Sequence, residues 1–134
     1  MNQRFSQWTY PEIKDGIPTK YHWVVQHIEQ FELGYQTDIG AFTYINARYG
    51  VYIEDFVQIG SHCSVYSHST IDDKSGPVRL KKNSKIGAHC VIMPGVTIGE
   101  NAVVGALSLV NKDVADNTMV AGSPIKKIKD LNEK

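Results

Sequence analysis

The chain has 134 residues, and its 14 acidic and 14 basic side chains give a formal net charge of zero at pH 7 with the histidines neutral. This length suits a single domain with one continuous core. The balanced charge offers neither the basic field that favours nucleic acid nor the acidic excess typical of disorder, so small molecules or further copies of the chain are the expected partners.

The N-terminal residues contain no hydrophobic region of the kind that directs secretion. No window reaches the roughly 18 apolar residues that a membrane-spanning helix needs. The sequence therefore predicts a soluble, cytoplasmic protein without membrane insertion.

Residues 1–24 are rich in aromatic side chains, namely Phe5, Trp8, Tyr10, Tyr21 and Trp23. An uncovered end of a β-structure invites aggregation. We therefore expect this N-terminal aromatic arm to cap the first coil of the repeat that follows.

An aliphatic residue then returns with a period of six. It occupies Leu33, Ile39, Ile45, Ile53, Ile59, Val65, Ile71, Leu80, Ile86, Ile92, Ile98, Val104 and Val110, and ten of the twelve intervals are six residues long. A period of six scatters side chains around a helix, whereas an even spacing keeps them on one side of an extended chain. The period predicts short strands joined by corners.

A second, mostly small residue follows four positions after most of these aliphatic residues. These second positions are Thr37, Thr43, Val57, Cys63, Ser69, Ser84, Cys90, Val96, Ala102, Ser108 and Val114. Strands that turn every six residues and stack on the preceding coil form a parallel β-solenoid. We predict a single all-β domain in which residues 25–122 form a parallel β-helix with three hexads per coil.

Two interruptions break the repeat. Eight residues separate Ile45 from Ile53, with Tyr49 where a small residue is expected, and nine separate Ile71 from Leu80. A solenoid core accepts extra residues only at its corners, so both insertions must project outward. We predict a projecting loop at 72–79 that forms one wall of a cleft.

Counting hexads from Leu33 predicts which side chains share a face. Cys63 and Cys90 fall on different faces, so we expect two free thiols in the core rather than a disulfide. The same count predicts that Arg48, His68 and His89 stack on one outer corner, at the strand spacing of about 4.8 Å.

The C-terminal residues 123–134 begin with Ser123-Pro124 and carry Ile125, Ile128 and Leu131 at helical spacing. Proline is common at the first position of a helix. We predict a short amphipathic C-terminal helix over this range.

Residues 86–124, IGAHCVIMPGVTIGENAVVGALSLVNKDVADNTMVAGSP, resemble the C-terminal half of the hexapeptide-repeat acyltransferases of the sugar O- or N-acetyltransferase type. The resemblance is looser over 33–85, where the repeat and a histidine followed by a loop and a proline persist. It implies a left-handed parallel β-helix, a hand that the period itself does not give because β-crossovers are usually right-handed. It also implies a homotrimer with active sites between subunits, acetyl coenzyme A as acyl donor, a sugar acceptor and no metal.

His68 is the candidate catalytic residue. An imidazole can accept the proton that a hydroxyl or ammonium group loses as it attacks a thioester, directly and without an acyl-enzyme. In the sugar acetyltransferases the catalytic histidine stands just before a loop that breaks the repeat, which is the position of His68. In close relatives it often stands about two residues later, at the position of Thr70 here, and a surface histidine bonded to the loop is the alternative interpretation.

Three residues are candidates for binding the acceptor. Asn46 matches a segment where the family carries an acceptor-binding asparagine, and its amide could hydrogen-bond sugar hydroxyls or merely cap a strand. His89 could orient His68 or bind the acceptor, although a polar corner residue needs no such task. Asp72 could hold a histidine tautomer or an amino-sugar ammonium, or be simply solvated.

The resemblance also implies a coenzyme A site. In the family the pantetheine lies along the groove between subunits, near backbone that matches Gly87, Gly105 and Ala106. Later basic residues meet the nucleotide phosphates, and the matching positions are Lys112, Lys126 and Lys127; lysine is a usual phosphate partner.

Two rival functions stay open at this point. One is a zinc-dependent, carbonic-anhydrase-like protein of the same fold, for which His62, His68 and His89 would have to supply three ligands. The other is a non-catalytic β-helix scaffold, since fold does not fix function.

Overall fold

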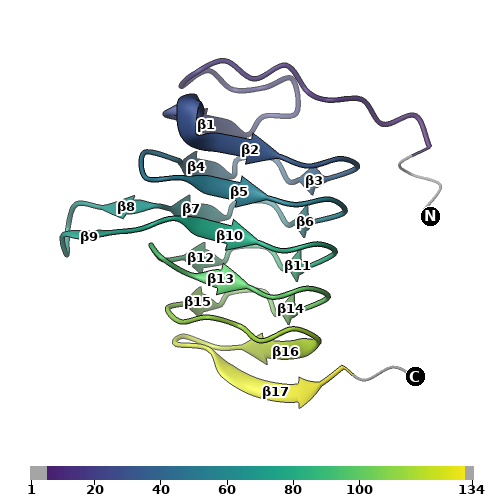
Figure 1. The fold of residues 1–134 in the computed structure, drawn as a ribbon, viewed down its shortest axis with the longest axis vertical. Coiled ribbons are helices and arrows are strands. Elements are labelled where there is room, and N and C mark those ends of the chain that lie inside the picture. The colour runs from purple at the N-terminus through teal and green to yellow at the C-terminus, as the bar shows by residue number, and fades with distance from the viewer. Residues whose placement is uncertain (1–5, 132–134) are drawn as a thin grey trace.

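The computed structural model describes residues 6–131, and it is an all-β solenoid of stacked coils. Each coil runs through three short strands, and equivalent strands of successive coils pair in parallel to give three flat faces (Figure 1). This is the arrangement of a left-handed parallel β-helix, as the sequence predicts. Between residues 6 and 131 no helix is long and apolar enough to cross a membrane.

The faces are numbered in the order in which the chain meets them. Face 1 contains β1 (Val24–Gln26), β4 (Tyr44–Asn46), β7 (Ser64–Tyr66), β12 (Val91–Ile92) and β15 (Leu109–Val110). Face 2 contains β2 (Phe31–Leu33), β5 (Val51–Ile53), β10 (Val78–Leu80) and β13 (Thr97–Ile98). Face 3 contains β3 (Asp38–Ile39), β6 (Gln58–Ile59), β11 (Lys85–Ile86), β14 (Val103–Val104), β16 (Thr118–Ala121) and β17 (Lys126–Asp130).

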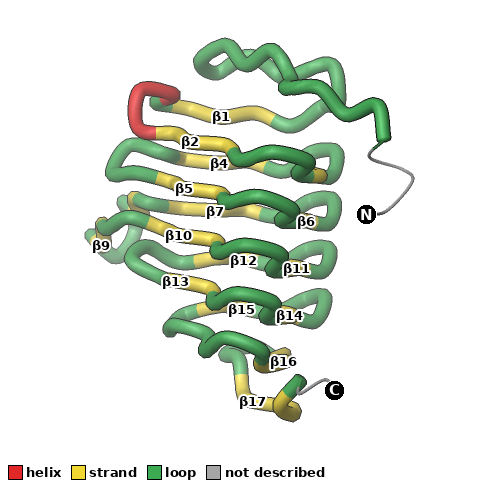
Figure 2. Tube along the Cα trace, turned by 45° about the vertical axis from the view of Figure 1, so that its right-hand side comes forward, coloured by secondary structure: helices red, strands yellow, loops and turns green. Residues whose placement is uncertain are grey.

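Two small elements lie outside these faces. A 3-10 turn, η2 (Ile28–Gln30), links β1 to β2 and is the helical segment in Figure 2. The strands β8 (His68–Ser69) and β9 (Lys74–Ser75) pair antiparallel and form a hairpin that projects from the solenoid.

The aliphatic residues of the repeat stack inside the coils and form the core. Ile45, Leu80, Ile92 and Ile98 are fully buried, and burial of such a side chain stabilises the fold by about 1.5–3 kcal/mol. Ile71 is the exception, because it is 98% exposed in the hairpin and Leu80 takes the place after Val65 in the solenoid. The projecting segment therefore spans residues 68–77 rather than the predicted 72–79.

Because Ile71 was counted as a core position, every hexad after it was assigned to the next of the three faces instead of its own. Cys63 and Cys90 consequently lie on the same face in neighbouring coils, since their next residues, Ser64 and Val91, are paired. Both are free, buried thiols, as predicted. The sulfur of Cys63 donates to Gly87 O at 3.2 Å and that of Cys90 to Gly105 O at 3.2 Å.

The neighbouring side chain of Cys90, together with burial, raises the pKa of Cys63 above its ordinary range. A thiol that stays protonated is a poor nucleophile. Cys63 is therefore a poor nucleophile, whereas the side chain of Cys63 lowers the pKa of Cys90 to about 7, and burial rather than protonation shields that thiol from reagents.

The corner between faces 2 and 3, here the asparagine corner, carries a ladder of side-chain amides. Asn83 Nδ2 donates to Asn101 Oδ1 at 2.7 Å, and Asn101 Nδ2 donates to Asn117 Oδ1 at 3.0 Å. All three asparagines have positive φ angles, 62°, 59° and 55°, a conformation that asparagine tolerates better than most residues.

The N-terminal arm covers the first coil, as predicted. Trp8 stacks edge-on against Tyr35 with ring centroids 5.8 Å apart, and its indole N–H donates to Thr37 O at 2.8 Å. Trp23 is buried against Phe31. Phe5 lies outside the described residues.

The predicted C-terminal helix is wrong. Residues 126–130 form β17, which pairs antiparallel with β16 at the last coil. The open edge of β16 explains the difference, because β17 hydrogen-bonds backbone groups that a helix would leave unpaired. The end of the predicted helix, 132–134, lies outside the described residues.

Replacing Asn101 by Ala should lower the free energy of unfolding by about 1–3 kcal/mol, because the variant loses two hydrogen bonds and alanine tolerates positive φ less well than asparagine. Asn101→Gly should cost less, since glycine adopts positive φ freely. Urea unfolding followed by circular dichroism measures both. Wild-type stability in both variants would contradict a stabilising ladder.

Neither thiol should react with an aromatic disulfide reagent in the folded protein, and both should react in urea. Raising the pH to about 9 should leave Cys63 unreactive, because its pKa in the folded protein lies above the ordinary value of about 8.5. The absorbance of the aromatic thiolate released from the reagent measures how many cysteine thiols have reacted. Modification under native conditions at the rate seen in urea would contradict the burial of the pair.

Candidate active site

His68 stands where the chain leaves face 1 and enters the projecting hairpin (Figure 1). The strand β7 ends at Tyr66, and the chain rejoins face 2 at Val78, which pairs with Val51. His68 pairs with Ser75 across the hairpin and is half-buried. The corner between faces 1 and 2, here the hairpin corner, carries both insertions, in residues 47–50 and 67–77.

The other insertion lies at the same corner, one coil earlier. The ring of Tyr49 packs edge-on against His68, with centroids 5.2 Å apart and planes at 77°. The guanidinium carbon of Arg48 lies 5.6 Å from the centroid of the Tyr49 ring. The two interruptions of the repeat therefore place an imidazole, an aromatic ring and a cation together.

The predicted acceptor residues Asn46 and Asp72 lie at this corner but already have partners. The Oδ1 atom of Asn46 accepts from Arg48 N at 3.1 Å, so the amide caps the turn after β4. Its Nδ2 donates to Tyr44 Oη at 3.4 Å. Asp72 and Lys74 form an exposed ion pair of 3.9 Å within the hairpin.

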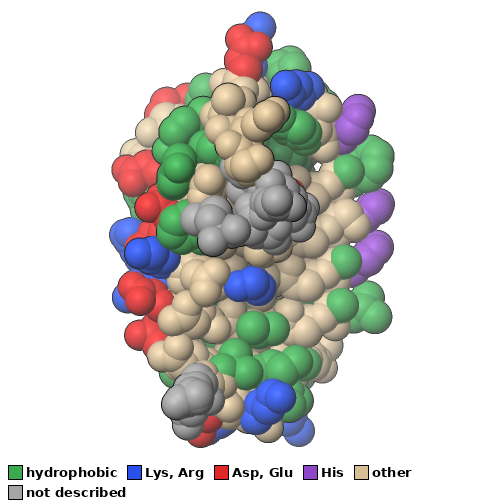
Figure 3. Space-filling model, turned by 90° about the vertical axis from the view of Figure 1, so that its right-hand side faces the viewer, with side chains coloured by type: hydrophobic (Ala, Val, Ile, Leu, Met, Phe, Trp, Pro, Cys, Tyr) green, Lys and Arg blue, Asp and Glu red, His purple; other side chains and the backbone are tan. Residues whose placement is uncertain are grey.

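His89 does not stack on His68, contrary to the hexad count. It lies on the corner between faces 3 and 1, here the histidine corner, where its ring is parallel to that of His62 at 4.8 Å and 5°. His22, Phe42, His62, His89 and Leu107 form this column, all with positive φ. Figure 3 shows the histidines along one edge, interleaved with hydrophobic side chains.

A signal for the histidine corner was present in the sequence. His22, Phe42 and His62 are spaced by 20 residues, which is the length of each of the first two coils. His89 follows His62 by 27 residues because the hairpin lengthens that coil, so only the pairing of Ser64 with Val91 brings it to the same corner.

Gly87, Gly105 and Ala106 lie on the histidine corner. A Cβ at Gly87 would be 2.6 Å from Ala106 N, so close stacking of the coils itself requires glycine there. Across residues 6–131, no backbone acceptor binds the amide N–H groups of Ala88 and Ala106. These two donors could bind an extended polar ligand.

The three predicted phosphate-binding lysines do not lie together. Lys126 pairs with Ala121, whose Cβ lies beside Gly105, so this lysine stands near the histidine corner. Lys112 follows β15 and belongs to the hairpin corner. Lys127 is in an ion pair with Asp130 at 2.8 Å.

The predicted base and the predicted cofactor backbone occupy opposite edges of face 1. Parallel strands begin at the histidine corner and end at the hairpin corner. Gly87, Gly105 and Ala106 precede their strands, whereas His68 follows β7. One chain therefore does not bring the two sets together.

The histidines do not form a metal site within one chain. His62 and His89 are neighbours, but His68 lies at the other edge of face 1. Between residues 6 and 131 there is no group of three or more His, Cys, Asp or Glu side chains that could hold a metal ion.

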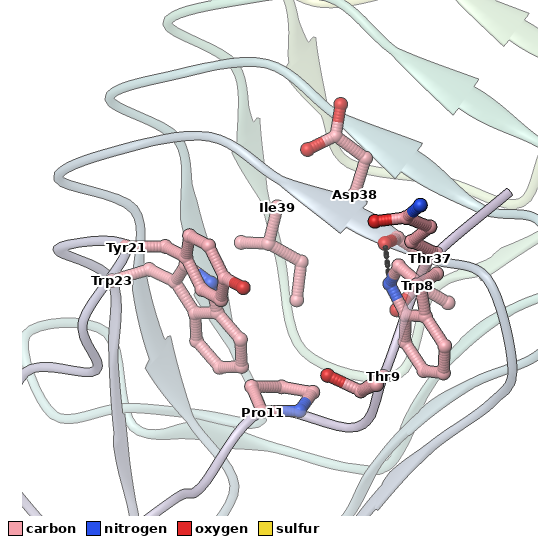
Figure 4. A pocket seen from close by; sticks show the side chains of 9 residues that line it. Trp8, Thr9, Pro11, Tyr21, Trp23, Thr37, Asp38 and Ile39 are labelled. Carbon is pink, nitrogen blue, oxygen red and sulfur yellow. Dashed lines mark hydrogen bonds between the residues drawn. The ribbon is translucent and has the colours of Figure 1, made fainter. Parts of the chain in front are cut away.

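A cavity of about 280 Å³ lies between the N-terminal arm and the first coil (Figure 4). Trp8 stands on one side, Tyr21 and Trp23 stand on the other, and Pro11 and Ile39 also line it. The indole N–H of Trp8 is already bonded to Thr37 O. The residues that line the cavity include one carboxylate, Asp38, and no histidine, and the cavity lies where the arm packs on the solenoid.

Residues 77–112 match the family model described as bacterial transferase hexapeptide (six repeats). The chain is 34% identical over 119 residues to galactoside O-acetyltransferase of Escherichia coli, covering 78% of this chain and 59% of that protein.

Two solved structures are similar to the chain. A hexapeptide-repeat-containing acetyltransferase of Vibrio cholerae, complexed with acetyl coenzyme A, has a TM-score of 0.77 at 28% identity, covering 83% of this chain and 66% of the other. A variant N-acyltransferase of Bacillus cereus, in complex with dTDP-4-amino-4,6-dideoxyglucose and coenzyme A, has a TM-score of 0.55 at 31% identity, covering 84% and 72%. The chain spans less than two thirds of the galactoside and V. cholerae proteins.

Proposed function

Because this chain belongs to the hexapeptide-repeat acyltransferase family, we propose that it transfers an acetyl group from coenzyme A to a hydroxyl or amino group of a sugar or nucleotide-linked sugar. The observation that carries the proposal is the position of His68, at the start of the hairpin that interrupts the solenoid. Relatives named as galactoside and maltose O-acetyltransferases, and the N-acyltransferase bound to an amino sugar nucleotide, support a sugar acceptor.

In the proposed reaction His68 is the general base. Its neutral imidazole nitrogen takes the proton from the acceptor as the acceptor oxygen or nitrogen attacks the thioester carbonyl. The tetrahedral intermediate collapses, the carbon–sulfur bond breaks, and the imidazolium returns the proton to the coenzyme A thiolate. The acetyl group passes directly to the acceptor, with no covalent enzyme intermediate.

The histidine corner is the proposed site for the pantetheine arm. The amide N–H groups of Ala88 and Ala106, which lack backbone acceptors within residues 6–131, would donate to the amide oxygens of the arm. Lys126 stands at the same corner and would meet a phosphate. Lys112 and Lys127 are weaker candidates, the first because it lies at the other corner and the second because Asp130 already neutralises it.

A homotrimer would complete this site. His68 and the pantetheine corner lie at opposite edges of face 1. A cyclic assembly joins two different patches of each copy, so the hairpin corner of one copy can face the histidine corner of the next. We propose three such sites per trimer, in a cytoplasmic enzyme.

Replacing His68 by Ala should lower kcat by about 10²- to 10⁴-fold, the usual contribution of a general base, and should leave acetyl coenzyme A binding unchanged. Release of coenzyme A is measured with a galactoside, maltose and a dTDP-linked amino sugar as acceptors. His22→Gln is the matched control, because His22 lies at the first coil, where Phe42 and His62 separate it from the part of the histidine corner that carries Ala88 and Ala106.

Turnover of His68→Ala within a few-fold of wild type would contradict the assignment of the base. Failure of the wild-type protein to release coenzyme A with any of the three acceptors would contradict the sugar assignment instead.

A further inference from the structure

Ser67 is a fully buried residue that joins the two insertions of the repeat. Its hydroxyl donates to Asn46 O at 2.8 Å and accepts from Tyr49 N at 2.9 Å. Its backbone carbonyl accepts from Gly76 N at 2.9 Å, at the return of the hairpin. One buried side chain therefore ties residues 47–50 to the base of the hairpin.

The segment that carries Tyr49 is consequently well fixed. Arg48 N donates to Asn46 Oδ1, Tyr49 N to Ser67 Oγ, and Gly50 N to Ala47 O at 3.0 Å. A loop with successive bonded amides holds its side chains in a narrow range of positions. The ring of Tyr49, 44% exposed, thus forms a fixed wall beside His68.

We propose that Tyr49, held in place by the buried hydroxyl of Ser67, is a positioning residue that sets the orientation of the His68 imidazole. This inference rests on the proposed function, in which His68 is the general base. Tyr49 does not exchange protons with the acceptor, and its effect on the reaction is exerted through His68.

Physical chemistry gives this contact two effects. An edge-on aromatic pair at 5.2 Å restricts rotation of the imidazole and keeps it aimed at one place, and a reacting group displaced by about 1 Å can lose about 10²-fold in rate. The imidazolium formed during the reaction also lies within the roughly 6 Å over which an aromatic ring attracts a cation.

The first test measures the imidazole itself and needs no substrate. The ring C–H resonances of the histidines are recorded by two-dimensional NMR, and His68→Gln identifies the His68 signal. Tyr49→Leu should move that signal, because the ring current of Tyr49 is lost, and should leave those of His62 and His89 in place.

The matched control is Tyr35→Leu. Tyr35 is 48% exposed, and its ring contacts are to Trp8 and Phe56 at another corner. This variant should leave the His68 signal unchanged. An unmoved His68 signal in Tyr49→Leu would overturn the proposal.

The second test measures turnover. Tyr49→Leu and Ser67→Ala should each lower kcat by about 10- to 100-fold with an unchanged KM for acetyl coenzyme A, whereas Tyr49→Phe, which keeps the ring, should retain most activity. Thr118→Val is the control for Ser67→Ala, because Thr118 is also a buried hydroxyl that donates to one backbone carbonyl, at the asparagine corner and outside both proposed sites.

The outcomes separate the two proposals. If His68→Ala is inactive but Tyr49→Leu and Ser67→Ala turn over at the wild-type rate, the positioning role is wrong and the general base stands. If His68→Ala retains activity, the proposed base is wrong, and the NMR result still shows whether Tyr49 packs against the His68 ring.

Discussion

The parallel pairing of each strand with its equivalent in the next coil is the constraint on which the rest of the structure depends. Each coil must bring its strands back over those of the coil before, so the inward positions can hold only stacked aliphatic or small residues. Extra residues are accepted only where the chain turns. The fold therefore confines the insertions to corners, and the insertions at residues 47–50 and 67–77 lie in neighbouring coils of one corner.

This constraint gives the candidate site its composition. The faces present short strands of regular geometry, whereas the hairpin corner holds His68 against Tyr49, with Arg48 beside the same ring. The histidine corner offers backbone amides without backbone acceptors instead, at Ala88 and Ala106 among the described residues. Because the two corners flank one face, a single chain does not bring these groups together.

The sequence predicted the solenoid correctly, because a hexad of aliphatic and small residues is compatible with few other structures. The prediction was wrong at Ile71, which was counted as a core residue because it is aliphatic but is 98% exposed in the hairpin. Only the pairing of Val78 with Val51 decides which residue resumes the core, and that pairing is a contact between coils that local sequence does not contain. The same error in the predicted hexad count placed His89 and His62 on different corners, and Cys63 and Cys90 on different faces.

The C-terminal strand was missed because Ile125, Ile128 and Leu131 have a spacing that suits a helix, while the open edge of β16 favours a strand.

The central claim is that the chain binds acetyl coenzyme A as an acyl donor, and calorimetric titration of the metal-free protein tests it most directly. The account predicts saturable binding at one site per chain, weakened by salt because lysine meets phosphate. The absence of saturable binding up to about 1 mM, the upper end of usual enzyme affinities for substrates, would contradict it.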